Sequence, residues 1–223
     1  MNKKVFLNEK PDEINYTVHY PDDYCDLPLL VYLHGAGERG KDISHLERHG
    51  IPQLLAKNKE FNAVVLCLQC PAMFVWDNVV EKVKNIIDKT VSEFDIKKDR
   101  ICLTGSSMGG FGTFAMAMTY NNFFSAIAPV AGGSMAWRAS VLKTTPVYAF
   151  HGEKDTTVIP EYSKIMVEAI NKCGGNARLV LMPEFGHNDC IDYVYDNTDI
   201  IDWLLSRRRT DFTKTPEFCE EWF

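Results

Sequence analysis

The chain has 223 residues, which is long enough for one large α/β domain and short for two. Its formal net charge is −6 and it has no long basic block, which argues against nucleic acid or an anionic membrane as the main partner. The N-terminal segment has no apolar core of signal-peptide length, and no apolar run approaches the roughly 18 residues of a transmembrane helix. Seven scattered cysteines without a framework favour reduced thiols, so we expect a cytoplasmic protein.

Strand-like and helix-like segments alternate along most of the chain. Short leading strands are predicted at 5–7 and 16–20, and apolar runs typical of strands buried on both faces follow at 29–34, 63–68, 101–103, 125–131, 146–151 and 178–182. Helix-like segments lie between and after them, at 44–57, 78–94, 111–120, 135–142, 161–173 and 189–207. The basic run Arg207–Arg209 closes the last segment and is interpreted as a solvated helix end.

This alternation predicts the fold class. Parallel strands need helical crossovers, so we expect a single α/β domain over 1–223: a mostly parallel, doubly wound sheet with helices on both faces. Its core would span about 29–207, followed by a C-terminal tail at 210–223 without clear periodicity. Ligands of such sheets bind beyond the carboxyl ends of the strands. Polar, glycine-rich segments fall at four of these ends, at 34–40, 105–110, 151–155 and 184–189.

The segment Gly105-Ser106-Ser107-Met108-Gly109 reads G-x-S-x-G between a strand and a helix. Small neighbours permit a tight turn that lifts the central hydroxyl out of the sheet, and the helix start offers free N–H groups to a developing negative charge. Ser107 is therefore the candidate nucleophile. Ser106 is the alternative, but the pattern centres on Ser107.

A serine hydroxyl needs a base to take its proton and an acid to orient that base. Asp155 and His187 follow two later strands, which gives the chain order Ser, Asp, His at strand ends. We predict Ser107 as nucleophile, His187 as general base and then general acid, and Asp155 as the orienting carboxylate. Glu153 is the alternative acid.

The reaction also needs donors for an oxyanion. The N–H of Met108, directly after the nucleophile, is the first candidate. The glycine-rich loop after the first buried strand supplies the second, and we predict the N–H of Ala36 there. His34, which precedes this loop, is expected to brace it.

Taken together, these segments resemble the α/β-hydrolase superfamily, and within it the carboxylesterase/phospholipase, dienelactone-hydrolase-like, feruloyl- or acetyl-esterase-like and "predicted peptidase" groups. The resemblance spans about 29–207 and is carried by 33–40, 69–71 with Trp76, 105–110, 151–155 and 186–187. It implies serine hydrolysis of a small-molecule ester through an acyl-enzyme, without cofactor or metal, and it supports the triad and the two oxyanion donors. No long insertion separates 131 from 146, where many relatives carry a lid, so a shallow, open site for modest acyl groups is expected. Trp76 is assigned to substrate binding, with core packing as the alternative.

Other patterns receive a structural interpretation. Gly35–Gly40 matches G-x-G-x-x-G, but the next strand ends without the acidic residue that a dinucleotide site needs. Cys67 and Cys70 form a C-x-x-C within a strand, where positions three apart face opposite sides. We therefore interpret them as structural cysteines and not as a zinc or redox site. His45 and His49 are expected on a solvated helix face.

Two alternative functions stay open. The first is peptidase or thioesterase activity with the same triad, and the second is a non-catalytic binding module on this fold.

Overall fold

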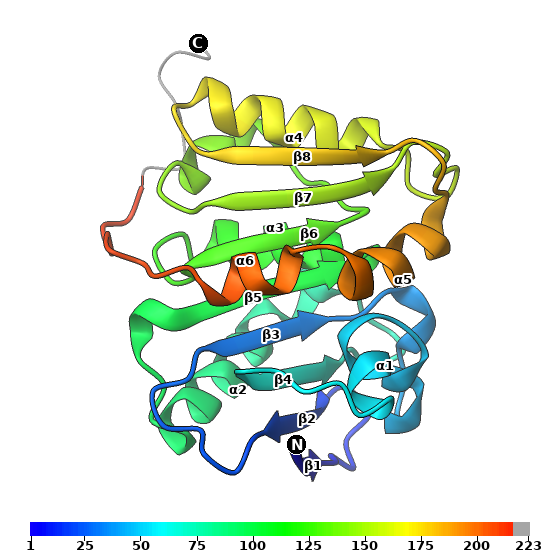
Figure 1. The fold of residues 1–223 in the computed structure, drawn as a ribbon, viewed down its shortest axis with the longest axis vertical. Helices are drawn as coiled ribbons and strands as arrows, with labels where there is room; N and C mark the ends of the chain where they lie inside the picture. Colours follow the sequence, from blue (N-terminus) through cyan, green and yellow to red (C-terminus); the bar gives the residue numbers. More distant parts are fainter. Residues whose placement is uncertain (216–223) are drawn as a thin grey trace.

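The apolar runs of the sequence form one sheet in the computed structural model, which describes residues 1–215. Within these residues the sheet has the strand order β1-β2-β4-β3-β5-β6-β7-β8, and all strands after β2 run parallel to one another (Figure 1). β1 and β2 form an antiparallel edge, in which β2 pairs with β4. The strands are β1 (Asn2–Phe6), β2 (Asn15–Tyr20), β3 (Leu29–Leu33), β4 (Val64–Gln69), β5 (Ile101–Ser106), β6 (Ala126–Val130), β7 (Val147–Gly152) and β8 (Ala177–Met182).

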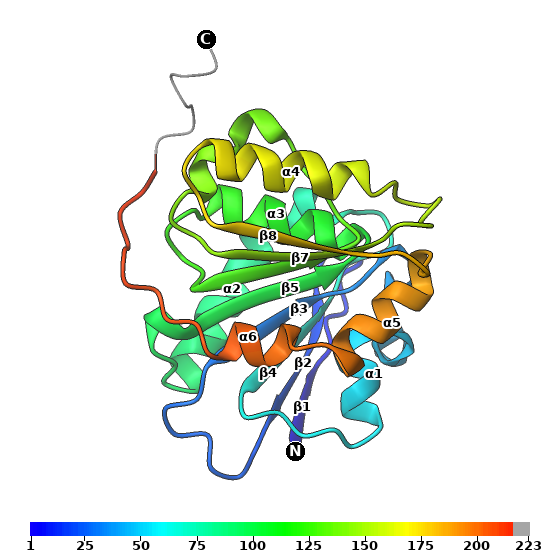
Figure 2. The same ribbon diagram turned by 45° about the horizontal axis from the view of Figure 1, so that its top comes forward.

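Helices cover both faces of this sheet (Figure 2). One layer contains α2 (Val80–Glu93), α3 (Met108–Thr119) and α4 (Glu161–Lys172), and the other contains α1 (Gly50–Ala56), α5 (His187–Asn197) and α6 (Ile200–Leu205). Alternate residues of a strand point to opposite faces, so Val31 and Leu33 of β3 pack in one core while Leu30 and Tyr32 pack in the other. The predicted α/β-hydrolase fold class is thereby confirmed.

The crossovers include short 3-10 helices: η1 (Ala36–Glu38), η2 (Ile43–Arg48), η3 (Trp76–Val79), η4 (Lys98–Arg100) and η5 (Ala136–Leu142). Only η5 lies between β6 and β7, so this connection carries no large lid. In residues 1–215, no helix has both the length and the apolarity required to cross a membrane.

Two segments predicted as helical each form two helices; within 44–57 the sequence also predicts a break or second start at Pro52. The segment 44–57 forms η2 and α1, which meet at His49 in an extended conformation, and Pro52 falls in the first turn of α1, where its missing N–H costs nothing. The segment 189–207 forms α5 and α6. Thr198 between them is extended, and its hydroxyl accepts a hydrogen bond from the Ile200 N–H at 3.3 Å. The break between the two helices therefore lies at Thr198 and Asp199, although the apolar periodicity of the sequence continues through it.

The interpretation of Arg207–Arg209 as a solvated helix end is wrong for Arg209. Its side chain is buried, and its guanidinium donates to the carbonyl oxygens of Phe124 and Asn121 and to the hydroxyls of Thr144 and Thr145, at 2.8 to 3.2 Å. A guanidinium has several donors in a fixed plane, so it can satisfy several loop acceptors at once. Arg209 therefore anchors the segment that follows α6 to the loops that precede β6 and β7. The predicted tail at 210–223 lies partly outside the described residues.

Candidate active site

Ser107 lies in the turn between β5 and α3, at the carboxyl edge of the sheet (right-hand side of Figure 1). Its backbone has φ 56° and ψ −120°, a region that costs a non-glycine residue of order 1–3 kcal/mol. The conformation is held by the Ser107 N–H, which donates to Val130 O at 2.9 Å, and by Ser107 O, which accepts from the Phe111 N–H at 3.1 Å. The turn thus presents the serine hydroxyl beyond the strand ends.

Close backbone contact explains the glycines of the motif. A Cβ on Gly109 would lie 1.9 Å from the carbonyl oxygen of Leu33, and one on Gly105 would lie 2.4 Å from the carbonyl oxygen of Gly109. Neither site has room for a methyl group, because the obstructing atoms are backbone. The start of α3 is therefore packed directly against the end of β3.

The three residues predicted as a triad are brought together. His187 is the first residue of α5, and its Nε2 lies 2.9 Å from Ser107 Oγ. Its Nδ1 lies 2.6 Å from Asp155 Oδ2. The Asp155 carboxylate is buried, whereas the His187 side chain is 13% exposed. A continuous hydrogen-bonded chain thus joins hydroxyl, imidazole and carboxylate.

The second oxygen of Asp155 is also fixed. Its Oδ1 accepts hydrogen bonds from the backbone N–H groups of Thr157 and Val158, both at 2.9 Å. This geometry is a local turn in which a carboxylate bonds the backbone two and three residues ahead. Sequence analysis did not identify Thr157 and Val158, because they contribute only backbone N–H groups, which almost any residue type supplies.

A second imidazole supports the acid loop. Burial lowers the pKa of His151, which favours its neutral form. Its Nε2 donates to Val158 O at 2.8 Å, and its Nδ1 lies 2.7 Å from the Ser163 hydroxyl, which donates to Gly132 O at 2.7 Å. The same Nε2 lies 3.3 Å from Asp155 Oδ2. His151 therefore holds the loop that carries the triad carboxylate.

His34 organises the loop that contains Ala36. The Cys70 N–H donates to His34 Nε2 at 2.9 Å, so the ring proton is on Nδ1, and that group donates to Gly35 O at 2.5 Å. The oxygen of Gly35 and the N–H of Ala36 belong to one peptide plane. By holding the oxygen, His34 fixes the direction of the Ala36 N–H, as the sequence predicted for a bracing residue.

Gln69 and Trp76 complete this support from the core. The buried Gln69 side chain donates to Glu38 O at 3.0 Å and to Asp42 O at 2.6 Å, a role that no sequence pattern predicts. Trp76 is fully buried, and its Nε1 donates to His34 O at 3.0 Å. The assignment of Trp76 to substrate binding is corrected accordingly: its ring packs in the core because its one N–H finds a backbone partner there.

A pocket of about 290 Å³ opens beside the serine and the histidine. It is lined by Gly35, Ala36, Gly37, Glu38, His49, Ser106, Ser107, Thr157, His187, Asn188 and Ile191. The hydroxyl of the alternative nucleophile, Ser106, is buried 3.0 Å from the Tyr32 hydroxyl, and the alternative acid Glu153 is exposed. Neither takes part in the chain of hydrogen bonds.

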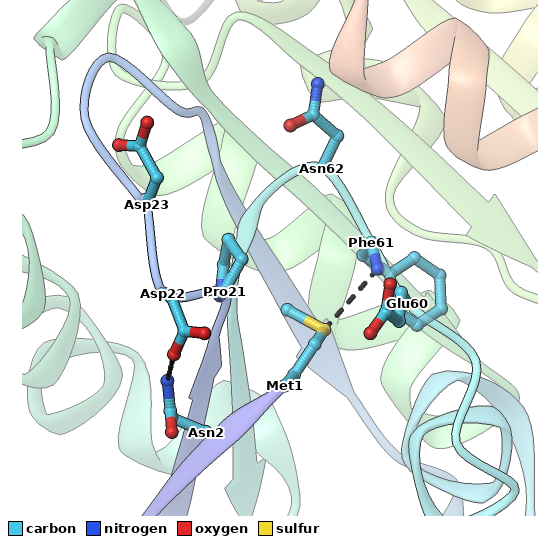
Figure 3. Close-up of a pocket in the computed structure, with 8 residues that line it drawn as sticks. All are labelled: Met1, Asn2, Pro21, Asp22, Asp23, Glu60, Phe61 and Asn62. Atoms are coloured by element: carbon cyan, nitrogen blue, oxygen red, sulfur yellow. Dashed lines mark hydrogen bonds between the residues drawn. The ribbon is translucent and has the colours of Figure 1, made fainter.

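A larger hollow of about 680 Å³ lies far from this chemistry, among the first residues, the turn after β2 and the loop before β4 (Figure 3). Its lining residues, Met1, Asn2, Pro21, Asp22, Asp23, Glu60, Phe61 and Asn62, include no histidine and no serine or cysteine nucleophile. In residues 1–215, no three His, Cys, Asp or Glu side chains are grouped to hold a metal ion. The smaller pocket is therefore the candidate active site.

Comparison with known proteins points in the same direction. A family model described as phospholipase/carboxylesterase matches residues 74–204. The chain is 30% identical over 132 residues to a bifunctional acetylxylan esterase/xylanase of Neocallimastix patriciarum. The aligned segment covers 57% of this chain and 19% of that protein. It is 39% identical over 51 residues to a poly(3-hydroxyalkanoate) depolymerase of Paucimonas lemoignei, of which it covers 12%. The chain thus spans less than a fifth of each of these two relatives.

Among solved structures, a thermostable esterase superposes with a TM-score of 0.79 at 28% identity, over 93% of this chain and 63% of its own. An acetyl xylan esterase from Aspergillus awamori superposes with a TM-score of 0.68 at 13% identity, over 92% and 99% of the two chains. The second likeness concerns the fold alone.

Proposed function

The chain belongs to the phospholipase/carboxylesterase family, and from this membership and the geometry of the pocket we propose that it is a serine hydrolase of carboxylic esters. The observation that carries the proposal is the chain of hydrogen bonds from Ser107 Oγ through His187 to Asp155. A neutral imidazole that donates from Nδ1 to a buried carboxylate has Nε2 free to accept the serine proton.

Ser107 Oγ attacks the ester carbonyl while His187 Nε2 takes its proton. The resulting oxyanion is bound by the N–H groups of Ala36 and Met108, which are the first residues of η1 and α3 next to the serine. His187 then gives the proton to the leaving alcohol, which leaves an acyl-serine. Water attacks this intermediate, His187 accepts a proton from the water, and the acid is released as Ser107 is restored.

The size of the pocket supports a short acyl group. A volume of about 290 Å³ lies at the low end for small-molecule sites. The Neocallimastix relative is by name an acetylxylan esterase/xylanase, which supports acetyl esters as the first substrates to try. We expect p-nitrophenyl acetate to be hydrolysed faster than the octanoate, and equal turnover of the two would contradict a small acyl site.

A fluorophosphonate probe tests the nucleophile. We expect it to label the protein with loss of activity on p-nitrophenyl acetate, and Ser107→Ala to abolish both label and turnover. Ser106→Ala is the matched control, because it removes a hydroxyl one residue away, and it should keep the label. Label that persists in Ser107→Ala would refute the assignment, and failure of the wild type to react would favour a non-catalytic binding module.

Thioester and peptide substrates test the alternatives that use the same triad. Side-by-side turnover of an ester, a thioester and a peptide with the same acyl group should be fastest for the ester.

The reducing cytoplasm remains the setting we propose, in keeping with the free state of the six cysteines in residues 1–215.

A further inference from the structure

The pocket wall contains a carboxylate that the proposed reaction does not use. Glu38, the last residue of η1, is 4% exposed, and its Oε2 has no hydrogen-bond partner within the described chain. His34 Nδ1 lies 3.6 Å away, beyond hydrogen-bond distance, and donates to Gly35 O. Buried carboxylate oxygens are nearly always hydrogen-bonded, because leaving one unpaired costs free energy. Oε2 of Glu38 therefore has only the His34 ring beside it, while the Glu38 side chain also lines the pocket.

The carboxylate is charged at neutral pH. Burial raises the pKa of Glu38, but the neighbouring imidazoles of His34 and His49 outweigh that effect and lower it overall. The His34 ring, whose N–H points toward this side of the loop, thus favours the ionised carboxylate.

Glu38 also lies close to the reacting atoms. A Cβ placed on Gly35 would be 3.3 Å from Glu38 Oε2 and 3.5 Å from Ser107 Cβ, so the carboxylate and the serine side chain border the same side of Gly35. A substrate group that reaches Glu38 must therefore be attached close to the scissile ester.

The other polar residues of the pocket suit the same kind of ligand. Thr157 and Asn188 line it with a hydroxyl and an amide, and His49 lines it with a ring whose Nδ1 is bonded to Asp192 at 2.9 Å. These groups both donate and accept hydrogen bonds, as hydroxyl-rich ligands require.

We propose that Glu38 recognises a free hydroxyl on the substrate, on the carbon next to the esterified one, so that the preferred substrates are partly acylated sugars or other polyols. This rests on the proposed function, because it names the substrate class of the same site. The hydroxyl donates to the Glu38 carboxylate while the neighbouring ester reaches Ser107. A hydrogen bond to a charged group outweighs one to a neutral group, so the effect on kcat/KM is measurable.

A pair of small esters that differ in one hydrogen bond tests this. 2-Hydroxyethyl acetate and 2-methoxyethyl acetate share the acyl group and the chain, and only the first can donate. For the wild type we expect kcat/KM to be about tenfold higher for the hydroxy ester. In Glu38→Gln and Glu38→Met that ratio should fall to near one, whatever the absolute rates become. Glu47→Gln, which changes an exposed glutamate of η2, should retain the wild-type ratio.

A wild-type ratio near one would overturn the proposal without any variant. It would also be overturned if the Glu38 variants lowered kcat/KM equally for both esters, since Glu38 would then only brace the loop. A strong preference for an amino-acid ester over both would indicate ammonium recognition instead and overturn it as well. Fluorophosphonate labelling of Ser107 tests the hydrolase function separately, because the labelling reaction does not require a substrate hydroxyl that could bind Glu38.

Discussion

Replacing Asp155 by asparagine tests the proposed catalytic chain, because the structure dictates how the new amide must sit. Asp155 Oδ1 accepts two backbone N–H groups at 2.9 Å, so the asparagine oxygen must stay at that position. The amide NH₂ then takes the place of Oδ2, 2.6 Å from His187 Nδ1. A donor facing Nδ1 makes that nitrogen an acceptor and moves the ring proton to Nε2.

With the proton on Nε2, His187 can no longer accept the proton of Ser107. We expect kcat on p-nitrophenyl acetate to fall by about 10⁴, the loss known for this change in a serine protease triad, which corresponds to about 5.5 kcal/mol of barrier. The fluorophosphonate labelling rate should fall with it. Asp199→Asn is the matched control: Asp199 accepts from the Tyr148 hydroxyl at 3.0 Å outside the pocket, and its loss should change kcat less than about twofold.

Both variants should be compared with the wild type for melting temperature, so that a folding defect is not read as a catalytic one. If folded Asp155→Asn kept kcat within about tenfold of the wild type, the tautomer argument and the role of Asp155 would be refuted.

Three further predictions concern the scaffold. Gly109→Ala should lower the free energy of unfolding by about 3 kcal/mol or more in urea titration, because its methyl group would overlap the carbonyl oxygen of Leu33; a loss below about 1 kcal/mol would contradict the contact. Arg209→Met should cost about 3 kcal/mol by leaving buried acceptors unpaired, whereas the exposed Arg208→Met should cost less than about 1 kcal/mol. Burial lowers the pKa of His19 from 6.5 to about 4 in the folded protein, so between these pH values the folded state binds fewer protons than the unfolded state. The free energy of unfolding should therefore fall as the pH drops from about 6.5 to 4, by up to about 1.4 kcal/mol per pH unit. The urea midpoint of the wild type should fall toward that of His19→Gln in this range, and midpoints that change in parallel with pH would refute the role of His19.

The sheet and the triad could be predicted because their signals are local. Each central strand is a continuous apolar run, and the turn at Ser107 combines glycines, a serine and a helix start within a few positions. Strand ends of a parallel sheet meet at one edge, which is why Asp155 and His187 could be assigned from chain order.

The features that were missed depend on distant contacts. Arg209 looks like part of a solvated basic run until the chain folds and places it between loops near Phe124 and Thr145. Trp76 follows a strand end, as a pocket residue would, but its ring reaches the His34 carbonyl in the core. Gln69 lies within an apolar strand, and no pattern indicates that its amide supports the loop after β3.

The tight junction between α3 and β3 also limits how this pocket could evolve. Its nucleophile side is built from backbone atoms in contact at Gly105 and Gly109, so enlarging it by substitution would disturb the sheet itself. The opposite side carries Thr157, Asn188 and Ile191, whose side chains can change without moving a strand. Libraries that aim to broaden acyl or alcohol scope should therefore diversify those three positions and leave the serine turn untouched.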